Sequence, residues 1–459
     1  MSVDEKHPQY TRFVRRWAEM RDHIAGTERI KERGEKYLPK PAAMRDPQDP
    51  KGERSAYNAY KTRAQYPEIV GPSIRSMSGV IHREKAGYEY PDALEYLRER
   101  ATLDSATLEQ LHRRISRELL GVGRCGLMVD TAEQGGDPYI ALYQTEAIIN
   151  WHETDQGVDM VVLDESDWEM NPETFAWTYV HWHRVLLLED GQYVVRLYRE
   201  GVQMTEDITP QRRGGGRLES LPFVFVDTND LTPEPDEVPL YGLAQIAAGI
   251  YRVDADYRQA LFLIAQPQRW VSGVKTENVP SAWGSNIVFV MEDPQAQAGI
   301  LEFTGQGVGA QRQAMIDGFE QAAQFGARLY DRTSGQESGE ARKIRHGQET
   351  ATLATIAQTG AAGLEQALGW CAEFMGANSD EVQVEVDTDF MDRTLGAQEM
   401  AAIIQAAGQG VISDQTAYEQ MQAGGRADTE RTWEEERELI EQGGLGMLGR
   451  EGGGNGEVS

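Results

Sequence analysis

The most constraining feature of this sequence is the order of its segments between about Pro239 and Gly376. A long helix, a short β segment and a second long helix are followed by a polar loop and a still longer helix. Apolar residues keep helical spacing in the first helix, at Leu240, Leu243, Ala247, Ile250, Tyr257, Leu261 and Ile264. A Pro- and Gly-punctuated stretch with the strand-like run 287–290 follows, and helical spacing resumes from Met315 to Tyr330. Helices that run out to a small β cap and return predict an extended hairpin rather than a catalytic pocket.

The two dominant helices are predicted over residues 240–266 and 340–376, about 40 Å and about 55 Å long at ~1.5 Å per residue. The longer helix has one apolar stripe, formed by Leu353, Ile356, Gly360, Leu364, Leu368, Cys371 and Phe374. It also contains Gly347, Gly360, Gly363 and Gly369, and each glycine in a helix costs about 1 kcal/mol relative to alanine. We therefore expect this helix to be bent and to pack closely on its neighbours.

The N-terminal part of the chain is predicted to be helical. Residues 8–38 read as one amphipathic helix that ends at the run Tyr37-Leu38-Pro39-Lys40-Pro41. A polar loop is expected over 42–55, and a helix over 56–84 that is interrupted near Pro67 to Pro72. Residues 91–120 predict two more helices, with Asp104 or Ser105 as the N-cap before Leu108.

The period changes to that of β-strands from Gly121 onward. Short β-type runs are predicted at 127–129, 139–143, 147–151, 160–163, 177–189, 193–198 and 221–226. Glu189-Asp190-Gly191 is a good hairpin turn. The glycine-rich segment 121–126 predicts a tight helix-to-strand turn rather than a dinucleotide site, because a strand follows it where a helix is needed. The segment from Arg212 to Arg217 predicts a flexible loop whose arginines are solvated or contact another subunit.

Composition describes a globular chain with room for two or three domains. The 459 residues are 40% hydrophobic with a mean hydropathy of −0.55, and no apolar run reaches the ~18–20 residues of a membrane span. The N-terminus MSVDEKHPQY lacks an apolar signal core, so we expect the chain to stay in the cell that makes it. Cys125 and Cys371 are far apart in apolar surroundings and are expected to be reduced and buried.

The net charge of −29, from 74 acidic and 45 basic residues, argues against tight binding to DNA. An acidic wall repels the phosphate backbone and would let a duplex slide past it. The alternative is that the charge only maintains solubility.

Catalytic motifs are absent from the sequence, and no cofactor is expected. It has no GxxxxGK[ST], GxSxG, HExxH or CxxC pattern. His181 and His183 share one face of a predicted strand but lack a third ligand at matching spacing, so a structural role is favoured. Asp387, Asp389 and Asp392 are predicted to be a solvated acidic face rather than a cation site.

A cluster of basic residues follows the polar loop. Arg342, Lys343 and Arg345 begin the longest helix, where the helix dipole favours acidic residues instead. Two interpretations stay open: these cations contact nucleic acid phosphates, or they are an ordinary basic start of a helix.

Taken in order, a set of local motifs resembles the portal (head-to-tail connector) proteins of tailed bacteriophages, over nearly the whole chain up to the Gly-rich tail. The motifs are YLPKP at 37–41, then Tyr57, Tyr60, Arg63, Ala64 and Tyr66, GVGRCGLMVD at 121–130, INW at 149–151, ADYR at 255–258, GARL at 326–329, and Glu340-Ala341.

The resemblance implies an α+β, mainly helical fold, with wing, stem, clip and crown parts, as one subunit of a ring of about twelve around a central channel. On this sequence the parts are an N-terminal helical wing at 1–120, a β-rich wing at 121–235, a stem helix at 236–266, a clip at 267–309, a second stem helix at 310–331, a tunnel loop at 332–339, a long kinked helix at 340–378, a crown at 379–445 and a disordered Gly-rich tail at 446–459.

The resemblance also implies a function that is mechanical rather than enzymatic. The ring sits at one capsid vertex of the virion after assembly in the host bacterial cytoplasm, and double-stranded DNA is packaged and ejected through it without sequence specificity. The implied partners are further copies of the chain, the terminase large subunit, the major capsid protein, the scaffolding protein and a head-completion or adaptor protein, with no membrane. The residues placed at the DNA channel are Thr333, Ser334, Gly335, Gln336, Glu337, Ser338, Gly339, Arg342 and Lys343.

Two other classes stay open. The first is a capsid or tail assembly scaffold without a DNA channel. The second is a metal-dependent enzyme that uses the region of His181 and His183.

Overall fold

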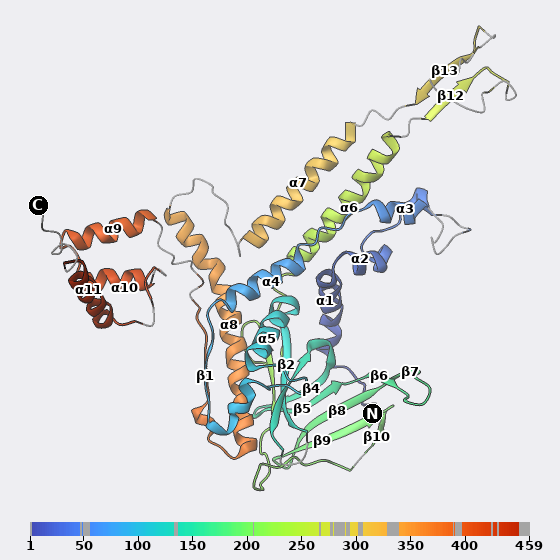
Figure 1. Ribbon diagram of the computed structural model, residues 1–459. Coiled ribbons are helices and arrows are strands. Elements are labelled where there is room, and N and C mark those ends of the chain that lie inside the picture. The colour runs from blue at the N-terminus through green and yellow to red at the C-terminus, as the bar shows by residue number, and fades with distance from the viewer. Residues whose placement is uncertain are drawn as a thin grey trace, which may run out of the picture. The chain divides into compact units, whose positions relative to one another are not determined.

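The structure is a computed structural model. It describes residues 2–45, 56–132, 136–204, 206–265, 268–275, 294–301, 306–327, 339–388, 397–423, 426–428 and 431–448, with residues 48, 279, 290 and 390. The chain divides into two compact units, Met1–Thr388 and Asp389–Ser459. Helices combine with antiparallel sheets, so the expected mixture of α and β structure is confirmed (Figure 1).

The N-terminal segment predicted as one helix is two. Helix α1 (Pro8–Ala25) ends at Gly26, whose φ of 85° is the left-handed region that glycine adopts without strain. Helix α2 (Thr27–Arg33) and the 3₁₀ helix η1 (Gly34–Lys36) follow. The prediction of a continuous helix over 8–38 is wrong because the positive φ at Gly26 redirects the chain.

The next helices agree with the sequence except at one cap. The segments are η2 (Ala42–Met44), α3 (Ala56–Arg63), α4 (Val70–Ile81), the 3₁₀ helix η3 (Asp92–Arg98) and α5 (Leu108–Val122). The N-cap of α5 is Thr107 rather than Asp104 or Ser105, because Thr107 and Gln110 form a reciprocal capping box. Gly123, with a φ of 87°, ends α5 and makes the predicted turn into the first long strand.

The β-rich section forms several antiparallel sheets. Its strands are β1 (Gly87–Glu89), β2 (Arg124–Thr131), β3 (Pro138–Gln144), β4 (Ile148–Thr154), β5 (Gly157–Asp164), β6 (Asp167–Met170), β7 (Trp177–Val180), β8 (Trp182–Glu189), β9 (Gln192–Arg199), β10 (Val202–Gln203) and β11 (Phe223–Asp227), with η4 (Thr145–Ala147) before β4. Strand orders are β10-β9-β8-β5-β4 and β11-β2-β3, and β6 pairs with β7 as a separate ribbon. The predicted hairpin turn is confirmed: Asp190 and Gly191 both have positive φ, and Glu189 pairs with Gln192.

The region 239–376, whose sequence most constrains the fold, has the predicted order of elements. Helix α6 (Tyr241–Ile264) is followed by strands β12 (Gln268–Ser272) and β13 (Gln297–Leu301), helix α7 (Gln306–Ala327) and helix α8 (Gly339–Met375). Strands β12 and β13 pair with each other. Of the strand-like run 287–290, residues 287–289 lie outside the described residues, as do residues 328–330 at the end of the second predicted helix.

Helix α8 forms much of the core of the first unit by packing on α5, β2, β3 and β11. After it come η6 (Ser379–Glu381) and β14 (Gln383–Glu385), which pairs with β1. Residues 379–388, predicted as the start of the crown, therefore belong to the first compact unit. The second unit contains α9 (Ala397–Gly408), α10 (Asp414–Ala423) and α11 (Trp433–Leu448). Helix α11 extends three residues into the segment predicted to be disordered, and residues 449–459 lie outside the described residues.

Candidate functional site

The residues predicted to line a DNA channel fall mostly outside the described part of the chain. Residues Thr333 to Ser338 are not among the described residues, and Gly339 is the first residue of α8 rather than part of the loop. Arg342, Lys343 and Arg345 lie in the first turns of α8, and their side chains are outside the described set. Asp389 and Asp392 are outside it as well. The candidate site within the described residues consists of helices α6, α7 and α8 and the segments that hold them.

Helices α6 and α7 pack against each other as an antiparallel pair (Figure 1). The direction follows from two contacts: Gly242 at the start of α6 meets Phe325 near the end of α7, and Ile250 meets Gly318. A Cβ at Gly242 would lie 2.7 Å from Phe325 Cε2, and one at Gly318 would lie 2.7 Å from Ile250 Cγ1. Both glycines therefore let the helices approach more closely than alanine would. The role of these two glycines cannot be predicted from the sequence, since nothing in it pairs them with an aromatic or aliphatic residue.

The two helices differ in burial. In α6 the buried residues are Leu243, Ala244, Ala247, Ala248, Ile250, Tyr251, Asp254 and Ala255, whereas Leu261, Phe262 and Leu263 at its far end are about 40% exposed. Among the described side chains of α7, over residues 307–325, only Ala322 is buried. Helix α7, 22 residues long, is thus covered mainly by α6 and leaves much of its surface open in a single chain.

The inner half of α6 is held by the segment 30–66, which we call the α6 anchor. Together they bury a tyrosine-rich cluster of Ile30, Tyr37, Leu38, Tyr57, Tyr60, Ala64, Tyr66, Ala247, Tyr251 and Ala255. Tyr60 Oη donates to Asp256 at 2.6 Å, the amide of Gln65 donates to Asp254 at 2.6 Å, and Arg63 donates to Gln259. Two groups of motifs that are about 200 residues apart, at 37–66 and 255–258, thus meet in one contact surface.

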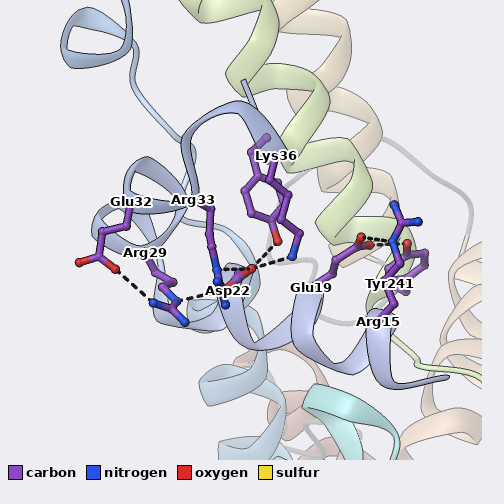
Figure 2. A network of polar contacts seen from close by, with 9 residues as sticks. Arg15, Glu19, Asp22, Arg29, Glu32, Arg33, Lys36 and Tyr241 are labelled. Carbon is purple, nitrogen blue, oxygen red and sulfur yellow. Dashed lines mark hydrogen bonds and ion pairs between the residues drawn. The ribbon is translucent and has the colours of Figure 1, made fainter. Parts of the chain in front are cut away.

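A carboxylate at the end of α1, beside the α6 anchor, organises the cations around it. Asp22 accepts hydrogen bonds from Arg29 at 3.0 Å, Arg33 at 3.0 Å, Lys36 at 2.9 Å and Tyr37 Oη at 2.8 Å (Figure 2). Burial on its own raises the pKa of a carboxyl group, but hydrogen bonds from Lys36, Tyr37 and Arg33 outweigh it and hold the pKa of Asp22 at about 2.

This network connects directly to α6. The carbonyl oxygen of Tyr37 accepts from Arg252 Nε at 3.0 Å, and Tyr241 Oη donates to Glu19 at 2.7 Å. Figure 2 shows Arg15 and Tyr241 reaching the same Glu19 carboxylate from α1 and α6. The charge network therefore fixes the base of the hairpin on the N-terminal helices.

A buried histidine lies beside this network. His23 Nδ1 is 2.7 Å from Tyr66 Oη, and burial lowers the pKa of His23 to about 4. Burial also raises the pKa of Tyr66 above its ordinary value. Both side chains are neutral at pH 7, which suits a buried contact between α1 and the segment after α3.

Helix α8 packs closely on a sheet whose strands β2 and β11 share a buried ion pair. A Cβ at Gly363 would overlap Val226 of β11, so the predicted close packing at a helix glycine is confirmed. Next to Val226, Asp227 lies 3.1 Å from Arg124 Nε, and both side chains are almost fully buried. Burial raises the pKa of Asp227 to about 8 while the positive charge of Arg124 opposes that shift. The Arg124 guanidinium also lies 4.2 Å from the centroid of Phe225, and because side chains alternate along β11 the pair lies on the face of the sheet opposite α8.

The glycine-rich loop 212–217 contacts its own chain. Arg213 forms an ion pair with Asp137 at 2.7 Å, and Arg212 lies 3.5 Å from Glu373 of α8. The backbone amide of Arg213 donates to the carbonyl of Phe374 at 2.6 Å. The side chains of Arg212 and Arg213 are 38% and 47% exposed, so they are solvated in part as predicted, and they also pair with carboxylates of their own chain.

The region of His181 and His183 is not organised like a ligand set. His183 is buried within β8, whereas His181 precedes the strand and is exposed. In the part of the chain that the structure describes, no three His, Cys, Asp or Glu side chains are grouped so that they could hold a metal ion. Cys125 and Cys371 are buried free thiols as expected, and burial raises the pKa of both. Among the described helices, none has the length and apolar character needed to cross a bilayer.

Comparison with known proteins gives one family match and several structural likenesses. Residues 239–375, from just before α6 to the end of α8, match the family described as Domain of unknown function (DUF4055). No curated protein matches the chain.

Similar solved structures include the neck of a native GTA particle, computed with C12 symmetry, at 12% identity and a TM-score of 0.39, covering 76% of this chain and 88% of that chain. The virion of a native gene transfer agent particle is similar at 13% identity and a TM-score of 0.39, covering 78% of this chain and 90% of the other. Both TM-scores are below 0.5.

Proposed function

We propose that this chain is the subunit of a portal ring, a channel for double-stranded DNA at one vertex of a phage-like capsid. The observation that carries the proposal is the difference between α6 and α7. One helix of the hairpin is anchored in its own chain, and the other has a single buried side chain among those described. Side-by-side copies in a closed ring would cover α7 and leave its remaining face toward a central bore. The order of motifs along the sequence supports the same assignment.

In this proposal the chain supplies an aperture and a vertex rather than a catalytic activity. A separate terminase motor moves the DNA, and head-completion or tail proteins dock later. The net charge of −29 per copy repels the phosphate backbone over most of the ring, so the duplex slides without being held. Arg342 and Lys343, at the start of α8, supply the few transient phosphate contacts of the channel.

The shape of the assembled protein tests the ring directly. Purified chain is imaged by negative-stain electron microscopy and its mass is measured over a range of protein concentration that extends well above that of a dilute monomer. The expected result is an annulus with a bore wide enough for a duplex, about 20 Å or more, and a mass of about twelve subunits. A compact monomer at the highest concentration, or a solid particle without a bore, contradicts the proposal.

The DNA contact is tested separately by the double substitution Arg342→Gln/Lys343→Gln. We expect intact rings with slower packaging or leakage of packaged DNA, because the channel then lacks its phosphate contacts. A control with the same change of charge is Arg98→Gln/Arg113→Gln, at exposed arginines of the first unit. If packaging and retention are unchanged in the first variant, Arg342 and Lys343 have no role in the channel.

A further inference from the structure

The ribbon formed by β6 and β7 has one aromatic face. In its antiparallel register Trp168 pairs with Tyr179 and Met170 pairs with Trp177. Because side chains alternate along a strand, these four residues lie on the same face. They are 56%, 44%, 45% and 60% exposed, in that order. Phe175, in the connecting loop, is 73% exposed.

The opposite face of the ribbon is attached to the neighbouring sheet. Glu169 accepts from Trp182 Nε1 at 2.7 Å and from Arg199 at 2.7 Å, and both partners lie in the sheet of β8 and β9. The connecting loop is closed by two backbone bonds between Asn171 and the segment Phe175–Ala176. The ribbon is thus a defined element with its polar side held by the sheet and its aromatic side toward solvent.

An exposed aromatic face of this kind needs a cover. A two-stranded ribbon is marginally stable on its own, and monomeric proteins rarely expose contiguous apolar patches larger than a few hundred Å². Four large exposed side chains share this face, and the rings of Trp168 and Tyr179 are in edge contact at 5.5 Å.

The charge around the ribbon indicates what covers it. No Lys or Arg occurs between Arg124 and Arg184, whereas this stretch contains twelve Asp and Glu residues. Five of the twelve pair with arginines of the same chain: Asp130, Asp137, Glu146, Glu165 and Glu169. Asp167 and Glu173, on the ribbon and in its loop, are exposed. A surface that is both acidic and aromatic is complementary to arginine, which pairs with carboxylates and stacks on aromatic rings.

The same chain has an arginine surface of this kind on α1. Residues 1–45 contain eleven Lys and Arg against seven Asp and Glu, in a chain with a net charge of −29. Arg12, Arg15 and Arg16 have the spacing of one helix face and are exposed. Arg12 and Arg16 lie over the ring of Phe13, at 5.5 and 5.7 Å from its centroid. We call these three residues the α1 arginine strip.

We propose that the aromatic face of the β6–β7 ribbon in one copy docks on the α1 arginine strip of a second copy. Within one chain both surfaces are exposed, so neither covers the other and the pairing requires another copy. An interface between two different surfaces of the same chain is head-to-tail, which is the type of contact that closes a ring. This inference identifies one subunit contact of the portal ring and rests on that proposed function.

A charge exchange between the two surfaces tests the docking. Arg12→Glu/Arg16→Glu makes the strip acidic, and Asp167→Lys/Glu173→Lys makes the ribbon basic. Each double variant alone places like charges at every such contact, so we expect at least a tenfold loss of rings by mass measurement. In an equal mixture the two variants can alternate around the ring, and every contact then joins surfaces of opposite charge. The mixture is therefore expected to restore the rings. The inference is wrong if each variant assembles like the wild type, or if the mixture does not recover.

The aromatic contribution is tested by Trp168→Ser/Trp177→Ser, with Leu103→Ser as a control at an apolar side chain that is 69% exposed. We expect the ribbon variant to lose rings while its circular dichroism and the control's assembly stay unchanged. If the ribbon variant forms rings normally, another protein covers this face. That result would overturn the inference and leave the portal assignment intact. A wild-type chain that forms no rings would overturn both.

Discussion

Helices α6 and α7 are nearly equal in length, at 24 and 22 residues, and pack on each other, yet their surroundings differ. The inner half of α6 is buried against the tyrosine-rich α6 anchor and receives hydrogen bonds from Tyr60 and Gln65. The described side chains of α7 include one buried residue, Ala322. One half of the hairpin therefore takes its stability from its own chain, and the other half depends on α6 and on what covers the remaining surface.

The largest expected effect follows from replacing a buried residue of α6. Tyr251→Ala removes a ring that is fully buried in the anchor cluster and should lower the free energy of unfolding by about 3–5 kcal/mol. Phe319→Ala on α7, where the ring is 48% exposed, should change the unfolding of the single chain by only about 0.5 kcal/mol. Urea unfolding at low protein concentration, where the chain is monomeric, measures both.

For ring assembly we expect the two variants to rank in the opposite order, with the larger effect from Phe319→Ala. Phe319→Ala should weaken ring formation at high concentration, because in the proposed ring a neighbouring subunit that covers α7 would lose a large apolar contact. Equal destabilisation of the monomer by both substitutions would show that α7 is buried to the same degree as α6, and the comparison would then be wrong.

A second, smaller effect is expected at the carboxylate that holds the base of the hairpin. Asp22→Asn leaves Arg29, Arg33 and Lys36 without their shared negative partner and should cost about 2–4 kcal/mol at pH 7, less than for a fully buried pair because the cations are partly exposed. Hydrogen bonds depress the pKa of Asp22 from 3.8 to about 2. Its contribution to stability is therefore complete above about pH 4 and is lost as the pH falls toward 2.

Unfolding measured between pH 2 and pH 7 separates this contribution from other effects. The wild type should lose stability in the acid range, and Asp22→Asn should lose less because its amide does not titrate. Glu32→Gln is the matched control: this carboxylate pairs with Arg29 at 3.2 Å but is 66% exposed, so its removal should cost less than about 1 kcal/mol. Parallel pH profiles for the wild type and Asp22→Asn would mean that Asp22 does not carry this charge contribution.

Sequence periodicity predicted the hairpin and α8 well because long helices repeat the same local signal many times. The predicted spans 240–266 and 340–376 are close to the observed Tyr241–Ile264 and Gly339–Met375. Single-residue events were less accessible. The break at Gly26 depends on one positive φ. The cap of α5 is Thr107 because of its reciprocal bonds with Gln110, although Asp104 and Ser105 nearby are equally good cap residues by type.

Contacts between distant segments were beyond what the sequence could predict. The motifs at 37–66 and 255–258 were visible as separate patterns, but their meeting through Tyr60 and Asp256 depends on how the anchor folds over α6. The aromatic face of the β6–β7 ribbon also required the register, since a slip of one residue would put Trp168 and Trp177 on opposite faces. The predicted channel residues Thr333 to Ser338 lie outside the described residues and stay a prediction.

The smallest of these effects concerns the contact between the two helices themselves. Gly318→Leu places a side chain where a Cβ alone would already lie 2.7 Å from Ile250 Cγ1 and 3.3 Å from Cδ1. Because Ile250 is buried in α6 and has little room to move, α7 must shift away, and overpacking of this kind costs about 1–3 kcal/mol. Gly309→Leu is the control on the same helix, since a Cβ there meets no described atom within 4 Å. Because leucine favours helix over glycine by about 1 kcal/mol, the control should be neutral or stabilising. The difference between the two variants in urea unfolding and in protease cleavage of α7 measures how strongly α6 holds its partner. If both variants behave alike, α7 is not positioned by α6, and its support comes from elsewhere.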